Sequence, residues 1–307
     1  MKLTLLALTV FASLAPGTAA PRPQYPGMLP TRKLGTQEQY RPNRAALLLR
    51  GPVRSVFEEA YNMYPDGKGI FTGNATYVFD RRGRLVEFMR GNNVLRDLYD
   101  DRFTYRADGR VASVERLFDR KPASRDVYAY DDARGRVEVK TYRAEDNFLG
   151  MILATEYDAR GNQTRSEMEL LAQPGDKGPP IKHVTETSYD YDEKGRPAST
   201  TVKYDGLTLV TFGSRREADG RLVTTTKDFR EAARSKLAKT VVTYDSRGDE
   251  LSTEAYAADG TLTSKITYER KFDARGNWVE EVTRTWDKGD ESPRESSFLS
   301  RRKIEYF

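Results

Sequence analysis

Few side chains in this sequence suit catalysis or metal binding. His183 is the only histidine among 307 residues, and the chain has no cysteine. One histidine cannot build a metal site or a catalytic triad without other partners. The absence of cysteine excludes thiolate zinc sites, cysteine nucleophiles and disulfides. Because His183 follows the Pro179-Pro180 pair, we expect it to be a solvated residue at the edge of a loop.

Acidic residues are numerous, but their spacing does not favour a reaction centre. The adjacent pairs Asp100-Asp101 and Asp131-Asp132 would point to opposite faces of a strand. Most other aspartates precede turn glycines, where turn formation explains them, and no glycine-rich phosphate loop is present. We therefore predict no catalytic, cofactor-binding or metal-binding residues and no enzyme activity. One alternative stays open: a hydrolase whose carboxylates gather on a concave face, about 5–10 Å apart.

The two tryptophans are the remaining candidates for a binding role. Trp278 and Trp286 are eight residues apart, so they share a face of a strand if no bulge intervenes. Core packing is the expected role. A platform on which sugar rings stack is the alternative.

The elements that would position these side chains follow from a recurring phrase. The order is an aromatic residue, any residue, an aromatic residue or turn former, Asp, two polar residues and Gly, as in Tyr77 to Gly83 and Tyr189 to Gly195. The first four glycines are spaced evenly by 26 residues, since 109−83, 135−109 and 161−135 are equal. A fixed period of this size indicates a repeat architecture. The glycines that end the copies are Gly83, Gly109, Gly135, Gly161, Gly195, Gly220, Gly248, Gly260 and Gly276.

Each phrase has the chemistry of a β-hairpin. Aromatic residues two apart face the same side of a strand, Asp initiates the turn, and Gly adopts the positive φ that other residues resist. Stacked hairpins predict an all-β fold: a long up-and-down antiparallel meander coiled into an open shell or half-barrel, with Tyr and Phe on the concave face. A closed barrel is the alternative, and a two-sheet sandwich comes third. Gly260 follows Gly248 by half a period, so a returning turn also carries Asp-Gly.

The two ends of the repeat region also suggest strands. Val53 to Phe57 predicts an opening strand, although Glu58 to Tyr61 fits a helix equally well. Arg301 to Phe307 predicts a final strand, whose charges would protect an exposed sheet edge from pairing.

These phrases resemble a known class of repeats. Tyr157 to Asn162 and Tyr191 to Arg196 are similar to the YD repeat of bacterial Rhs-type proteins. Phe272 to Val282 resembles the closing unit of small exported YD-repeat-like proteins, and Leu49 to Val56 resembles their opening. The resemblance covers residues 49–307 and implies a hollow β shell with no catalytic residues. This chain is too short to enclose a further domain, as the large Rhs-type shells do.

Composition and the N-terminal segment indicate the compartment. The 51 basic and 46 acidic residues are interleaved and give a net charge of +5, which predicts a solvated surface and no nucleic-acid binding. Weak affinity for anionic cell-surface polymers stays open. Met1-Lys2, the apolar run Leu3 to Leu14 and the small residues Ala15 to Ala20 indicate a secretory signal peptide, cleaved after Ala19 or Ala20. Without cysteine the product is not a lipoprotein.

The sequence thus predicts three segments and a binding role. Residues 1–20 are a signal peptide, 21–43 a disordered leader rich in Pro and Arg, and 44–307 a YD-repeat-like β domain. We expect a non-enzymatic protein, exported in soluble form to the periplasm or beyond, with no membrane span. It would act as a scaffold or binding surface for a cell-envelope polymer or protein, whose identity stays unknown. The alternatives are the hydrolase described above and an interaction or immunity partner of a toxin system.

Overall fold

The computed structural model describes residues 49–64, 66–92, 97–172, 178–193, 197–217, 221–228, 237–245, 249–288 and 294–307. The predicted signal peptide and leader lie outside these ranges.

Eighteen antiparallel strands of seven to thirteen residues form one sheet in the described part of the chain. The first nine are β1 (Val53–Met63), β2 (Gly69–Phe79), β3 (Leu85–Asn92), β4 (Asp97–Tyr105), β5 (Val111–Phe118), β6 (Lys121–Asp131), β7 (Arg136–Arg143), β8 (Leu149–Tyr157) and β9 (Gln163–Leu170). The others are β10 (Ile181–Tyr191), β11 (Pro197–Tyr204), β12 (Leu207–Arg216), β13 (Leu222–Asp228), β14 (Leu237–Tyr244), β15 (Glu250–Ala257), β16 (Leu262–Phe272), β17 (Trp278–Asp287) and β18 (Arg294–Tyr306).

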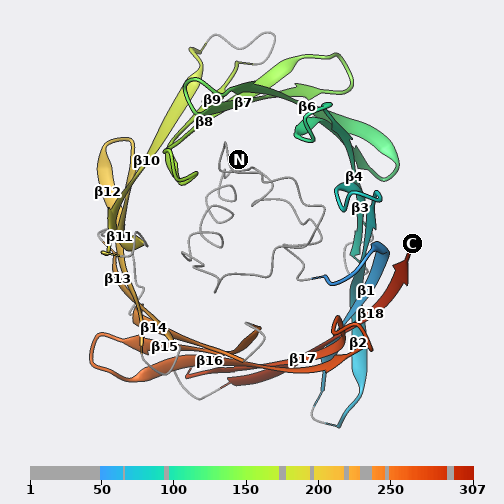
Figure 1. Cartoon of the computed structure of the whole chain (residues 1–307), viewed down its shortest axis with the longest axis vertical. Coiled ribbons are helices and arrows are strands. Elements are labelled where there is room, and N and C mark those ends of the chain that lie inside the picture. The colour runs from blue at the N-terminus through green and yellow to red at the C-terminus, as the bar shows by residue number, and fades with distance from the viewer. Residues whose placement is uncertain are drawn as a thin grey trace.

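The sheet is closed. Every strand pairs with its neighbours in the sequence, and β18 also pairs with β1, with Val56 opposite Ile304. Figure 1 shows the resulting ring. The prediction of an open shell was therefore wrong, and the closed-barrel alternative is confirmed. A twisted sheet of this many strands brings its first and last strands together, and closure satisfies both edges.

Closure also corrects the predictions for the two end strands. Glu58 to Tyr61 lie in β1 and not in a helix. The charges of Arg301 to Phe307 protect no exposed edge, because β18 is hydrogen-bonded on both sides, to β17 and to β1.

The repeated phrase forms the turns at one end of the barrel, which we call the motif rim. In the turn between β2 and β3, the Asp80 amide donates to the Arg84 carbonyl and the Gly83 amide donates to the Asp80 carbonyl, both at 2.9 Å. Gly83 has a φ of 82°, so this position favours glycine. A register shift falls beside the aromatic residue before the turn, here Phe79. Such bulges increase the local twist and curve the sheet toward closure.

The other described glycines of the repeat also lie in turns. Positive φ angles occur at Gly109, Gly135, Gly161, Gly260 and Gly276. Gly260 lies in the returning turn between β15 and β16, at the opposite end of the barrel, which we call the far rim. Gly195, Gly220 and Gly248 lie outside the described residues.

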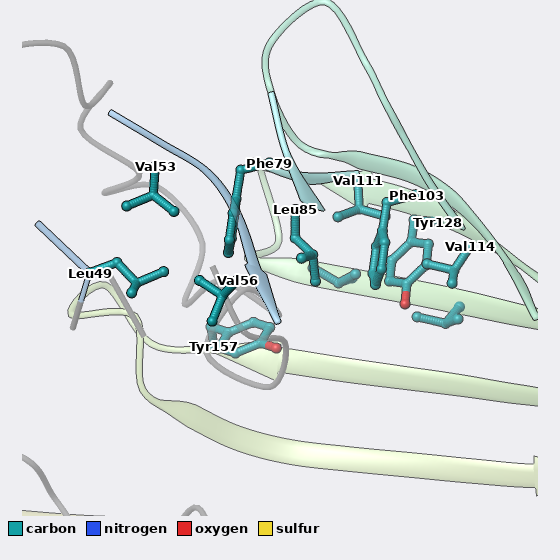
Figure 2. Packing of buried hydrophobic residues seen from close by; sticks show 12 residues of the cluster. Leu49, Val53, Val56, Phe79, Leu85, Phe103, Val111, Val114, Tyr128 and Tyr157 are labelled. Carbon is teal, nitrogen blue, oxygen red and sulfur yellow. The ribbon is translucent and has the colours of Figure 1, made fainter. Parts of the chain in front are cut away.

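One face of the sheet carries the hydrophobic core. Val56 and Val114 on this face are 0% exposed, and they belong to a cluster that runs from β1 to β8 (Figure 2). Leu49 joins the cluster, and residues 49–52, which lead into β1, lie on the inner side of the ring in Figure 1. The core face is therefore the inner wall. Strand alternation places the neighbouring side chains on the outer wall.

The seam between β18 and β1 is reinforced at the motif rim by Asn277, which is 1% exposed. Its Oδ1 accepts from the Arg50 amide at 2.5 Å, and its Nδ2 donates to the Arg50 carbonyl at 2.9 Å and to the Tyr306 hydroxyl at 2.7 Å. Asn162 bonds Tyr191 in the same way at 2.7 Å, but within the continuous wall. Asn277 thus connects Tyr306 on β18 to Arg50, which lies just before β1.

Asn277→Ala should lower the free energy of unfolding by about 2–3 kcal/mol more than the matched variant Asn162→Ala. The reason is that removal of Asn277 leaves the partly buried amide and carbonyl of Arg50 without these partners. Urea unfolding followed by circular dichroism measures both variants. Equal losses would mean that the seam bonds add nothing beyond the turn contact that the two asparagines share.

Candidate functional site

Large apolar side chains are exposed on the inner wall near the far rim. Tyr99 lies opposite Phe118, four residues from the core pair Phe103 and Val114, so all four share the inner face. Tyr99 and Phe118 are each 39% exposed. The strand pairings place three more exposed residues opposite inward-facing residues of neighbouring strands, and therefore on the same face. We call the set the apolar band: Ile70, Tyr99, Phe118, Ile181 and Phe298.

A charged belt lies on the inner wall between the core and the apolar band. It comprises Glu58, Arg116, Asp126, Arg270, Glu281 and Arg302. Arg270 Nε binds Glu281 Oε2 at 2.6 Å, and both side chains are less than a fifth exposed. Ion pairs in such surroundings are screened less than pairs in open water.

Arg116 is fully used by its partners. Its two terminal nitrogens bind the two oxygens of Asp126 at 3.0 and 2.6 Å, and Thr141 also donates to Asp126 at 2.8 Å. Burial alone would lower the pKa of Arg116, but Asp126 outweighs burial and the pKa is raised. This cluster is a saturated structural pair.

Arg302 is held differently. Its Nε donates to Glu58 Oε2 at 2.8 Å, and its guanidinium carbon lies 3.3 Å from the centroid of the Trp278 ring. Here burial prevails over Glu58 and lowers the pKa of Arg302. Burial, followed by the charge of Glu58, also raises the pKa of the neighbouring Tyr77. The belt at this point therefore contains a cation that its anionic partner only partly compensates.

Charges on the outer wall are paired across strands. Arg165 binds Glu186 at 3.2 Å, Lys265 binds Glu254 at 2.9 Å, and Lys271 binds Glu280 at 2.6 Å. Exposed pairs of this kind contribute little stability each, but together they neutralise the outer surface locally.

The structure corrects two sequence predictions for individual residues. His183 lies within β10 and not at a loop edge; its Nδ1 is 3.0 Å from Asp205 Oδ2, and its ring stacks on Tyr204. A register shift separates Trp278 from Glu280, so the eight-residue spacing does not place Trp278 and Trp286 on one face. Arg302 also covers one face of the Trp278 ring, which is then closed to a sugar ring.

The adjacent acids point to opposite faces, as predicted for Asp100 and Asp101. Asp101 interacts with Arg116 at 3.8 Å on the inner wall, whereas Asp100 pairs with Arg102 at 2.9 Å. Within the described ranges no cluster of acids and histidine could hold a metal ion. Every Asp or Glu with a shifted pKa is shifted downward, toward the ionised form.

Sequence reasoning missed the charged belt and the apolar band. Glu58 fell in the segment that was ambiguous between strand and helix, and Arg302 in the strand expected to form an edge. Alternation along each strand could have identified these inward-facing residues. It could not have shown that they meet until the pairing of β18 with β1 was known.

Comparisons with known proteins leave the family open. No family model matches the chain, and no curated protein matches it. Among solved structures, it is similar to a porin-like protein from Bacteroides uniformis, with a TM-score of 0.47 and 12% identity over 83% of this chain and 98% of that one. A LolA superfamily protein from Nitrosomonas europaea gives a TM-score of 0.25 and 11% identity over 84% and 87%. Neither TM-score reaches 0.5, so the functional argument rests on the barrel's own residues.

A search of the described residues for long apolar helices finds none able to cross a membrane.

Two motif aspartates, Asp158 and Asp273, each accept a hydrogen bond from a tyrosine later in the sequence. Asp273 is partly buried, which acts to raise its pKa, but hydrogen bonds from Tyr306 and from the Asn277 and Arg275 amides lower it overall. Asp158 shows the same balance, with bonds from Asn162 and Tyr191. Ionised aspartate is therefore the form that the folded turns stabilise.

The folded barrel should lose stability as the pH falls below about 4. The folded pKa of Asp158 and Asp273 is lower than the value of 3.8 for a free aspartate, so their stabilisation is complete above that value and is lost as pH falls through the folded pKa. Urea midpoints measured from about pH 6 to pH 2.5 should fall less steeply for the double variant Asp158→Asn, Asp273→Asn. Parallel curves would contradict this role.

Proposed function

We propose that this chain is a non-enzymatic exported binding protein of the cell envelope, and that its binding surface is the inner wall of the barrel. The ligand is an apolar part of an envelope polymer or protein. The observation that carries the proposal is the apolar band, in which five large side chains remain 39–56% exposed on the face that elsewhere forms the core. Export follows from the signal peptide that the sequence predicts.

The two walls differ in what they offer to a ligand. The outer wall presents charges that already have partners across the strands, which reduces their attraction for an anionic polymer. On the inner wall, side chains such as Phe118 and Phe298 are incompletely covered. Exposed apolar surface is a feature of interaction sites, and covering it is favourable by roughly 25 cal/mol per Å².

The inner carboxylates favour binding over hydrolysis. Asp126 and Glu281 are each held by an arginine at 2.6 Å, and Glu58 is bound by Arg302. Each of these carboxylates is therefore already committed to an ion pair and is not open to act on a substrate.

A neutral apolar dye tests the proposed surface. Nile red should bind the purified protein with enhanced fluorescence, and the double variant Tyr99→Ser, Phe118→Ser should weaken binding by about tenfold, which corresponds to ~1.4 kcal/mol of lost burial. The matched control is Phe57→Ser, Val127→Ser: these side chains are similarly exposed, at 36 and 37%, but lie on the outer wall. Equal weakening in both variants, or no binding by the unmodified protein, would contradict the proposal.

A further inference from the structure

Arg302 has hydrogen-bonding capacity that the protein leaves unused. Its side chain is 7% exposed, and its Nη1 is buried without a hydrogen-bond partner in the described structure. Trp278 covers one face of the guanidinium, and Glu58 occupies Nε. A buried donor without an acceptor costs about 1–3 kcal/mol, so a native structure that retains one calls for an explanation.

Arg116, an inward arginine of the same belt, has no such deficit. Arg116 donates from both terminal nitrogens to the two oxygens of Asp126, and its anionic partners raise its pKa. Arg302 has one carboxylate oxygen on its Nε, and burial lowers its pKa. Acidic side chains of the belt therefore satisfy the terminal nitrogens of Arg116 but leave Nη1 of Arg302 without an acceptor.

We propose that the free edge of Arg302 is a subsite for an oxyanion, a carboxylate or phosphate group carried by the ligand of the inner wall. Guanidinium presents planar paired donors that match the oxygens of these groups. An oxyanion that binds here would accept a hydrogen bond from Nη1. It would also add negative charge beside the buried guanidinium, which Glu58 alone does not fully compensate. Glu58, whose side chain is 22% exposed, is the partner positioned to move aside.

The position of Arg302 also defines the shape of the ligand. Phe298 of the apolar band lies four residues earlier on β18, on the same face, which corresponds to about 13 Å along the strand. A ligand with its oxyanion at Arg302 would place an apolar body over Phe298 toward the far rim. This assignment of an amphiphile rests on the proposed function, whereas the oxyanion subsite can be tested separately.

Trp278 provides a local reporter, because the chain has only two tryptophans. In the Trp286→Phe background, Trp278 fluorescence should change saturably on titration with inorganic phosphate and with acetate at constant ionic strength. Dodecanoate and dodecyl phosphate should produce the same change at concentrations at least about tenfold lower. The tighter of these two long-chain ligands identifies the preferred head group.

Three substitutions in this background decide the proposal. Arg302→Gln should abolish the response to all four oxyanions. The matched control is Arg284→Gln, which should leave the response unchanged, because Arg284 is an exposed arginine on the outer wall of the neighbouring strand β17 and binds Glu269. Glu58→Gln should strengthen oxyanion binding by at least about threefold, because it removes the competing carboxylate. This variant decides the question even if Arg302→Gln does not fold.

The outcomes separate the subsite from the proposed function. No saturable Trp278 response to any oxyanion, or unchanged affinity in Glu58→Gln, would overturn the subsite. Neutral dodecanol binding as tightly as dodecanoate would also overturn it while leaving the apolar surface intact. A response to phosphate and acetate without Nile red binding would support the subsite and contradict the proposed function.

Discussion

Backbone pairing between β1 and β18 is the constraint on which the rest of the structure depends. Without it the meander would have two unpaired edges, and the inner and outer walls would not be distinct surfaces. With it, each strand of the described sheet is hydrogen-bonded on both sides. Asn277 secures the same closure at the motif rim through the Arg50 backbone.

The repeated phrase supplies the local geometry that makes closure possible. A register shift beside the aromatic residue before the turn, as at Phe79 and Tyr105, adds curvature at this rim, and Asp158 accepts a hydrogen bond from Tyr191 of the next hairpin. Arg160 stacks over that same ring at 3.8 Å. The phrase therefore couples neighbouring hairpins as well as forming turns, which gives its aspartates a structural role.

Local features could be predicted from the sequence, and long-range ones could not. Strands and glycine turns follow from alternation and from residues such as Gly83 and Gly161, because the relevant interactions span few residues. Closure could be given only as the alternative to an open shell, since it depends on twist accumulated over eighteen strands. The belt was missed because Glu58 and Arg302 are 244 residues apart and meet only across the seam. His183 was misplaced because the strand β10 begins just after Pro180.

A cross-link across the seam tests the closed barrel most directly. Ala60 and Ser300 are paired neighbours on β1 and β18, and opposite residues in an antiparallel pair lie about 4.5–5.5 Å apart between Cα atoms, within disulfide range. Since the native chain lacks cysteine, the double variant Ala60→Cys, Ser300→Cys should form one intramolecular disulfide on mild oxidation, detected by mass spectrometry and gel mobility. The control Ala60→Cys, Thr187→Cys, with its second cysteine on β10, should form none. A folded double variant that stays reduced, or cross-links no faster than the control, would contradict the closed barrel.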